Sequence, residues 1–249
     1  MKYKISFLIV IALGMAIILS SYTFQNKEGV AKISFPLGNV LVLKVGEKQM
    51  SKAVFNMNLF EGDKVKTQPQ SRCEIKFKDG SIVRIDEQSI YTIEKASISD
   101  KEKNVQSELS IGKLWANVKK LTKSSDKWKL RGPSAVVAIR GTIYRMDAEA
   151  DSTTLVKVYE GSVGVGSPGW QMGTVEPQKK PGPPQQIKGP EQIQGPKQVT
   201  LEEWFEIIKA QQQIMVKPDG TFQKSEFDIA DDAKNSWVQW NLERDKLIE

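Results

Sequence analysis

The chain has 249 residues, 39% hydrophobic and 27% charged, which is ordinary composition for a globular protein. It has no histidine and one cysteine, Cys73, which excludes histidine-based catalysis, intrachain disulfides and histidine- or cysteine-rich metal sites. The net charge of +6 is too small to indicate nucleic-acid binding by itself.

Residues 1–24 have the pattern of an export signal: Lys2 and Lys4 precede an apolar run over residues 5–19, and small polar residues follow. The run is slightly shorter than the roughly 20 residues that span a bilayer, so a cleaved signal peptide and an uncleaved membrane anchor both fit. In either case the lysines stay inside and the rest of the chain is delivered outside the cytoplasm. We therefore expect an extracytoplasmic protein of the periplasm or cell envelope, anchored in the inner membrane if the segment is not cleaved.

Residues 28–165 read as short strands separated by turns. Between residues 71 and 77, alternation places Cys73, Ile75 and Phe77 on one face and charged residues on the other. The Asp79-Gly80 pair then predicts a tight turn, because Asp-Gly readily adopts the left-handed conformation that hairpins require. Turn signals recur about every ten residues with little helical periodicity, which predicts a mainly β domain, either a β-sandwich or a short β-roll.

Short motifs follow one another through this domain. They are Gly38-Asn39-Val40, Leu59-Phe60-Glu61-Gly62-Asp63, Phe77-Lys78-Asp79-Gly80-Ser81, Gly112-Lys113-Leu114-Trp115, Arg140-Gly141-Thr142 after the apolar stretch 135–139, and Tyr159-Glu160-Gly161-Ser162. In this order and at these separations, residues 35–165 closely resemble the FecR domain family. The resemblance implies an extracytoplasmic, β-rich domain. The best-known members of the family contact the signalling domain of an outer-membrane transducer and control a sigma factor through a cytoplasmic N-terminal segment.

This chain departs from those regulators at its N-terminus. The apolar run begins at Ile5, which leaves too little chain before it for a segment that binds a sigma factor. The resemblance therefore implies the sensor-like domain without that cytoplasmic output.

We expect the residues of these motifs to be structural. The glycines are explained by turns, and Asp63 and Asp79 by hydrogen bonds to the backbone of their own turns. Arg140 follows an apolar stretch, so we expect a partly buried guanidinium that pairs with carbonyls or with a turn aspartate. The alternative is a binding or catalytic cluster of Asp63, Asp79 and Arg140. Cys73 lies on the apolar face of its strand and is expected to be an unreactive core thiol. The motif residues are Gly62, Asp63, Asp79, Gly80, Arg140, Gly141, Thr142 and Gly161.

Basic residues are concentrated between residues 113 and 131, where Asp126 is the one acidic residue and Trp115 and Trp128 flank the stretch. On an exported protein, such a surface favours an acidic glycan, a cell-wall polymer, an anionic lipid or an acidic protein over nucleic acid. The alternatives are a solvated hairpin with its tryptophans packed inward, or a docking site for the acidic C-terminal tail of this chain. The candidate binding residues are Lys119, Lys120, Lys123, Lys127 and Trp128.

Residues 166–199 hold most of the chain's 11 prolines, together with glycine and glutamine. This composition predicts an extended linker, or a strap along the β domain, without helix or regular sheet.

Residues 200–249 return to periodic patterns. Thr200 and Glu203 form a capping box that predicts a helix. Pro218-Asp219-Gly220 predicts a small hairpin between residues 214–216 and 221–223, and a last helix is predicted over residues 230–247. Segments this short cannot form a core alone, so we expect this small α/β element of helix, hairpin and helix to pack on itself or on the β domain. The first helix would place Leu201, Trp204, Phe205 and Ile208 in one apolar stripe, and the last would align Ala233, Trp237, Trp240 and Leu247.

Together these patterns predict a non-enzymatic binding or scaffolding protein of the cell envelope, without cofactor or metal. We expect recognition of another envelope protein through an edge strand or a sheet face, because open sheets offer unpaired backbone groups and aromatic anchors. The alternative is binding of an acidic glycan, a cell-wall polymer or an anionic lipid surface through residues 113–131. Paired carboxylates are the remaining route to catalysis, and the sequence does not locate such a pair in a cleft.

Overall fold

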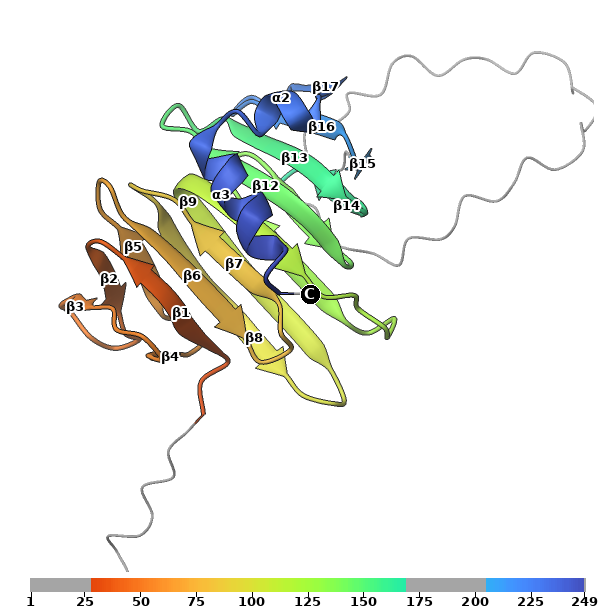
Figure 1. Cartoon of the computed structure of the whole chain (residues 1–249). Helices are drawn as coiled ribbons and strands as arrows, with labels where there is room; N and C mark the ends of the chain where they lie inside the picture. The colour runs from red at the N-terminus through yellow and green to blue at the C-terminus, as the bar shows by residue number, and fades with distance from the viewer. Residues whose placement is uncertain (1–27, 169–204, 249) are drawn as a thin grey trace, which may run out of the picture.

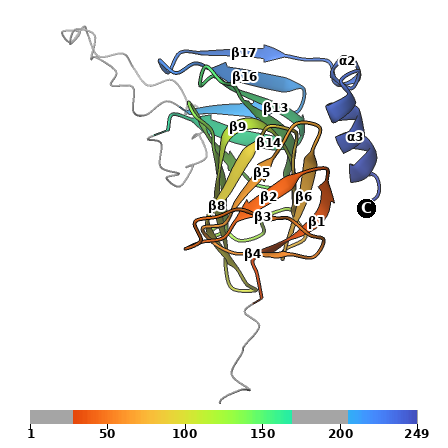
Figure 2. The ribbon, with the colours of Figure 1, turned by 90° about the vertical axis from the view of Figure 1, so that its left-hand side faces the viewer.

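The computed structural model describes residues 28–168 and 205–248, which form two facing β-sheets joined by one long strand (Figures 1 and 2). We call them sheet A and sheet B. The strand order in sheet A is β4 (Asn58–Leu59), β1 (Ala31–Leu37), β6 (Arg72–Phe77), β7 (Ile82–Ile85), the second part of β9 (Lys103–Val118), β12 (Thr142–Ala148), β13 (Thr154–Glu160), β16 (Gln212–Val216) and β17 (Phe222–Glu226). The strand order in sheet B is β3 (Ser51–Lys52), β2 (Val40–Leu43), β5 (Lys64–Thr67), β8 (Ile90–Ile98), the first part of β9, β10 (Lys127–Arg131), β11 (Val136–Ile139), β14 (Ser162–Gly166) and β15 (Phe205–Lys209).

Consecutive hairpins alternate between the two sheets as the chain advances. The pair β10–β11 lies in sheet B, β12–β13 in sheet A, β14–β15 in sheet B and β16–β17 in sheet A. In the described sheets neighbouring strands are antiparallel, apart from β9 and β10, which pair in parallel. The chain thus builds both sheets together from one end to the other, and the predicted mainly β fold is confirmed.

One strand, β9, belongs to both sheets. Its residues 103–111 pair with β8 in sheet B, and residues 112–118 pair with β12 in sheet A. The change of sheet falls at Gly112, whose φ of +100° lies in the left-handed region. A Cβ at this position would lie 2.1 Å from Ser89 Oγ, so the crossing requires glycine.

The core lies between the two sheets. Inward-facing side chains fill it, among them Ile33, Ile75 and Trp128, which are each at most 1% exposed. Cys73 belongs to this core, as expected. Burial, together with the charge of Glu74, raises the pKa of its thiol, so the thiol is protonated and shielded from solvent.

Residues 205–248 complete the two sheets and then cover one of them. Strand β15 pairs with β14, and β16 pairs with β13, so the C-terminal segment packs on the β domain. The hairpin predicted around Pro218-Asp219-Gly220 is confirmed as β16–β17. Helices α2 (Ile229–Asp232) and α3 (Ser236–Asp245) lie against the outer face of sheet A (Figures 1 and 2). The predicted last helix is therefore present in two pieces, because the Asn235 side chain accepts a hydrogen bond from the Trp237 N–H and starts a second helix.

The first predicted helix is wrong for the residues that the structure describes. Residues 205–209 form β15, in which Ile208 is buried and the neighbouring Ile207 is 39% exposed. Pairing with β14 overrides the helical periodicity of this segment. Residues 200–204, with the capping box, lie outside the described residues.

The proline-rich segment is an insertion in a hairpin. Gly166, at the end of β14, pairs with Phe205, at the start of β15. The segment therefore connects neighbouring strands of one sheet and does not separate two folded units. The structure does not describe residues 169–204, for which an extended conformation is predicted. It does not describe residues 1–24 either, for which an export signal is predicted. Within residues 28–168 and 205–248, no helix is long and apolar enough to cross a membrane.

Candidate functional site

The turn motifs that the sequence singled out are structural in this fold. Gly62, Gly80 and Gly161 have φ values of +88°, +85° and +80°, the left-handed conformation expected of turn glycines. Asp79 accepts hydrogen bonds from the Ser81 N–H at 3.0 Å and from Ser81 Oγ at 2.9 Å. These residues hold the turns that connect the strands.

Asp63 fixes the turn before β5 to a neighbouring loop. Its buried carboxylate accepts hydrogen bonds from the Phe60 N–H at 2.9 Å and the Val45 N–H at 3.0 Å. Lys44 Nζ donates to the same carboxylate at 2.7 Å. The predicted role as a turn residue is confirmed, and the local backbone together with Lys44 accounts for these contacts.

The Arg140-Gly141-Thr142 motif forms the turn between β11 and β12. Arg140 is exposed, so the prediction of a partly buried guanidinium is wrong. The apolar residues ahead of it are β11 itself, and the chain leaves the sheet at this point. Gly141 has a φ of +87°, and Thr142 Oγ1 donates to the Ser162 carbonyl at 2.9 Å. These contacts do not support the alternative that Arg140 forms a binding or catalytic cluster with Asp63 and Asp79.

The basic stretch presents lysines without an aromatic partner on the surface. Trp128 is 1% exposed and packs edge-on against Phe77, with ring centroids 4.9 Å apart, so its prediction as a contact residue is wrong. Trp115 is also buried. Strand β10 runs parallel to the first part of β9, so the stretch is not a hairpin. The exposed candidate residues are Lys119, Lys120, Lys123 and Lys127.

The outer face of sheet A carries charged side chains on neighbouring strands, and α2 and α3 lie over it (Figure 2). A sheet face that is covered by other elements is ordinarily apolar, because burying charges is costly. These residues were not singled out by the sequence, and we call them the charged face. They are Arg72 and Glu74 of β6, Arg84 of β7, Arg145 and Asp147 of β12, and Lys157 of β13.

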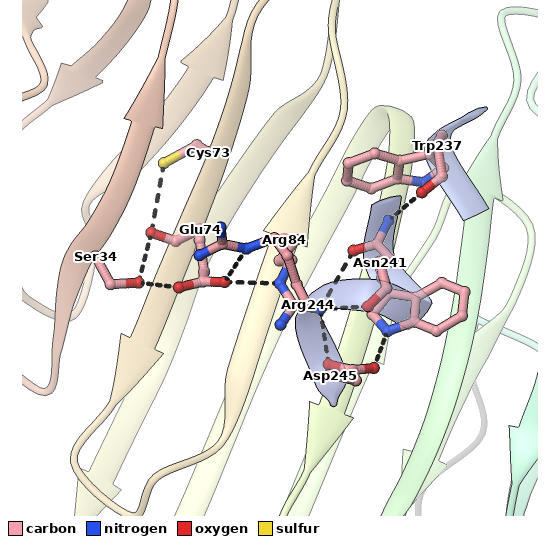
Figure 3. A network of polar contacts seen from close by, with 9 residues as sticks. Ser34, Cys73, Glu74, Arg84, Trp237, Asn241, Arg244 and Asp245 are labelled. Carbon is pink, nitrogen blue, oxygen red and sulfur yellow. Dashed lines mark hydrogen bonds and ion pairs between the residues drawn. The ribbon is translucent and has the colours of Figure 1, made fainter. Parts of the chain in front are cut away.

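Arg84 is the centre of the first polar network on this face (Figure 3). Its side chain is fully buried, and its Nε donates to Glu74 Oε2 at 2.7 Å. Its Nη1 donates to Asp245 Oδ1 of α3 at 2.8 Å. Trp115 Nε1, from β9, donates to the other oxygen of Asp245 at 2.8 Å. Both oxygens of the tail carboxylate are therefore bound by groups that the sheet supplies.

Glu74 ties the same network to α3 and to β1. It accepts hydrogen bonds from Arg244 Nε at 3.0 Å and from Ser34 Oγ at 2.8 Å, in addition to the bond from Arg84. Burial favours the neutral acid, but the hydrogen bonds from Arg244, Arg84 and Ser34 outweigh it and lower the pKa of Glu74. Glu74 is therefore ionised at neutral pH.

A second carboxylate, Asp232 at the end of α2, is bound by β12 and β13. Lys157 Nζ donates to it at 2.7 Å and Arg145 Nη1 at 3.4 Å, and the Tyr159 hydroxyl also donates to it. Burial opposes ionisation, but the bonds from Lys157 and Tyr159 and the charge of Arg145 lower the pKa of Asp232. The tail aspartates thus pair with sheet A. Of residues 113–131, Trp115 binds Asp245, whereas the other partners of Asp232 and Asp245 in these networks come from outside that stretch, so the predicted docking of the tail on the basic residues is wrong for these contacts.

Aromatic rings fill the space between the two networks and the helix. Trp237 and Trp240 of α3 are stacked with ring centroids 5.3 Å apart. The Arg72 guanidinium lies over both rings, at 5.1 and 5.2 Å from their centroids. On the sheet side, Trp115 packs on Tyr159, with ring centroids 4.3 Å apart. The predicted aromatic side of the last helix is therefore its docking face in this fold.

A second surface lies at the end of the two sheets, where β17 is the last strand of sheet A. All five of its residues are exposed. It pairs with β16 on one side, and no described strand pairs with its other side. Ile207 of β15 and Met215 of β16, which are 39% and 40% exposed, belong to the same end. Among the described residues there is no group of three or more Asp, Glu or Cys side chains arranged to hold a metal ion.

Comparisons with known proteins agree with the motifs. Residues 63–164 match the family model described as FecR protein. Two crystal structures of a "putative anti-sigma factor" from Parabacteroides distasonis ATCC 8503 are similar at 16% identity and a TM-score of 0.45, over 66% of this chain and 60% of that chain. This chain therefore matches only about three fifths of the length of that protein. No curated protein matches it. The turns built by Asp63, Asp79 and Gly161 fall inside the matched region, so the part of the chain that carries these motifs, residues 63–164, is the part that matches the FecR protein family model.

Proposed function

We propose that this protein is a non-enzymatic binding or scaffolding protein of the cell envelope, which engages another protein by strand addition to β17. The observation that carries the proposal is the exposure of all five residues of this edge strand. An exposed edge is a template for pairing with another chain. The FecR domain supports a regulatory setting, and the pattern of residues 1–24 supports delivery to the envelope.

The register of the β16–β17 hairpin identifies which backbone groups point outward. The Lys217 N–H donates to the Thr221 carbonyl, and the Phe227 N–H donates to the Gln211 carbonyl. In an antiparallel pair, such hydrogen-bonded positions alternate along the strand. Lys224 lies between them, opposite Ile214, at a non-hydrogen-bonded position. Its N–H and carbonyl therefore point away from β16, toward a strand that would add to the edge.

The Lys224 side chain crosses the open end of the two sheets. Its Nζ donates to the Ile207 carbonyl of β15 at 2.7 Å and lies 3.7 Å from Glu206. A lysine on an edge strand discourages indiscriminate pairing between sheets. The specific partner that we propose adds a strand beside β17, where the outward N–H and carbonyl of Lys224 pair with it.

The substitution Lys224→Pro is expected to abolish capture of the partner. Proline removes the outward N–H and blocks strand addition, while the ladder to β16 keeps its bonds because this N–H is not part of it. The matched control Lys224→Ala removes the side chain but keeps the N–H, and is expected to retain capture. The measurement is crosslinking in intact cells followed by identification of the crosslinked protein, with circular dichroism to verify folding. Equal capture by the wild type and both variants would exclude the β17 edge as the binding surface.

The second candidate function, binding of an acidic polymer or anionic lipid, is favoured by the exposure of the basic lysines. Replacement of all four by glutamine separates the two candidates. Binding through the lysines should fall steeply as salt rises and be lost in the glutamine variant, whereas strand addition should survive both. Retention of envelope polysaccharide by the wild type alone, with no crosslinked protein, would establish the second function in place of the first. The lysines to replace are Lys119, Lys120, Lys123 and Lys127.

A further inference from the structure

We infer that the charged face of sheet A is a docking surface for an acidic helical segment of a partner protein, and that α2 and α3 occupy it as an intramolecular competitor. This surface is distinct from the β17 edge, and the inference goes beyond the proposed function. Three features of the structure carry it: the composition of the face, the two carboxylate positions on it, and the Arg84 donor that the tail leaves unpaired.

The composition of the face suits contact with water. Arg72, Glu74, Arg84 and Lys157 all project from it, beside the aromatic rings of Trp115 and Tyr159, whereas the inner face of the same sheet is apolar. Burial of such ions costs several kcal/mol each unless every one is paired. An apolar face would hold a permanent cover more tightly than this one does. The charged face is therefore compatible with an uncovered state, in which its ions are hydrated.

The sheet contains two preformed positions for a carboxylate. At the first, Arg84 Nη1 and Trp115 Nε1 bind the two oxygens of Asp245. At the second, Lys157, Arg145 and the Tyr159 hydroxyl surround Asp232. The donors come from strands β7, β9, β12 and β13, and the tail contributes only the acids. Any helical segment with two carboxylates in similar positions presents the same groups to the sheet.

The tail does not provide a hydrogen-bond acceptor for every donor at its contact with the charged face. Arg84 Nη2, a donor of the sheet, is buried at this contact and has no hydrogen-bond partner within the described residues. On the tail side, Trp237 Nε1 is likewise buried without a partner among the described residues. A buried donor without an acceptor costs about 1 to 3 kcal/mol. A partner segment that supplies a further oxygen to Arg84 therefore gains an interaction that the tail does not make. An isolated helix as short as α3 is also marginal in water, so the tail loses its helical structure when it is displaced.

The test uses the full-length protein and a fluorescently labelled synthetic peptide of residues 228–248 as the acidic probe. The double variant D232N/D245N weakens the internal tail, and we expect it to bind the peptide at least tenfold more tightly than the wild type does. The matched control D231N/E243Q removes the same two charges from exposed positions of the same segment and should behave as wild type. A peptide that itself carries both asparagine substitutions should not bind. Fluorescence anisotropy gives the affinities, and hydrogen exchange reports whether α3 is released.

Two outcomes would overturn the inference. Release of α3 in D232N/D245N without a gain in peptide binding would show that the face does not act as a receptor. Full protection of α3 in the same variant would show that the carboxylates do not hold the tail. If the double variant does not fold, D245N alone is measured in the same way. Concentration-dependent dimers of wild type that are lost in D245N would identify a second copy as the occupant and contradict a separate partner. Lys224→Pro does not alter these readouts, so the two proposals fail independently.

Discussion

Gly112 allows a single strand to serve both sheets. Its left-handed backbone turns β9 from sheet B into sheet A, and the space for a side chain is taken by Ser89. Gly46 has a similar φ, +82°, but no atom lies within 4 Å of its Cβ position. The two glycines thus share the backbone requirement and differ in the available space.

The substitution Gly112→Ala is expected to destabilise the protein by about 3 kcal/mol or more, because a left-handed alanine is strained and its methyl group collides with Ser89. Gly46→Ala should cost only about 1 kcal/mol, the backbone contribution alone. Urea denaturation of both variants gives the comparison. Equal losses would show that the crossing of β9 tolerates a side chain.

At the residue scale, the sequence predicts the roles of the turn residues correctly but does not predict which arginine is buried. The turn glycines and Asp63 are recognisable because their roles depend on neighbouring residues. The sequence predicts a partly buried Arg140, but Arg140 is exposed, and Arg84 is the arginine whose side chain is fully buried. A signal for Arg84 exists, since it is the one charged residue of the strand Ile82–Ile85. Its partner Asp245 lies far away in sequence, and no local pattern connects them.

The helices α2 and α3 depend on carboxylates that are ionised in the folded protein. Asp232 and Glu74 both have a pKa below the ordinary value, as a result of their bonds to cations and hydroxyl groups. The groups facing Asp232 are Lys157, Arg145 and Tyr159, and those facing Glu74 are Arg84, Arg244 and Ser34. In each case the folded state holds fewer protons than the unfolded state does near pH 4.

We therefore expect the contact of α2 and α3 with sheet A to be fully stable above about pH 4 to 5 and to weaken as the pH falls through the lowered pKa values of Asp232 and Glu74. Acrylamide quenching of tryptophan fluorescence measures this, because release of α3 exposes the buried Trp237. The control is Asp232→Asn, which removes one of the two titrating groups and should give a shallower pH dependence. Quenching at pH 2.5 equal to that at neutral pH would show that ionised Asp232 and Glu74 do not hold α2 and α3 on sheet A.

At the element scale, local patterns predicted the strands, the hairpin β16–β17 and the position of the last helix. They failed at residues 205–209, where spacing typical of a helix occurs in a strand. The pairing with β14 decides this segment, and that pairing skips the whole insertion between Gly166 and Phe205. Helical periodicity over so few residues does not distinguish a helix from an edge strand.

At the scale of the whole molecule, the proline-rich insertion joins strands that are already neighbours. Replacing residues 170–203 by four residues of glycine and serine should stabilise the fold by about 1 kcal/mol, because a shorter connection costs less entropy to close. The measurement is the urea midpoint at constant m-value. A loss of stability instead would show that the deleted residues contribute favourable contacts. The composition of the insertion was evident from the sequence, but its place within a single sheet was not, because strand pairing is a long-range property.

The charged face of sheet A also affects the order in which the molecule can fold. During synthesis the N-terminal part of a chain emerges first, so the strands up to β14 exist before residues 205–248 are available. An apolar outer face would be exposed during that interval and would promote aggregation. On this face Arg84, Glu74 and Lys157 accompany Trp115 and Tyr159, so we expect hydration of these ions to lower the tendency of the incomplete protein to aggregate before its C-terminal helices arrive.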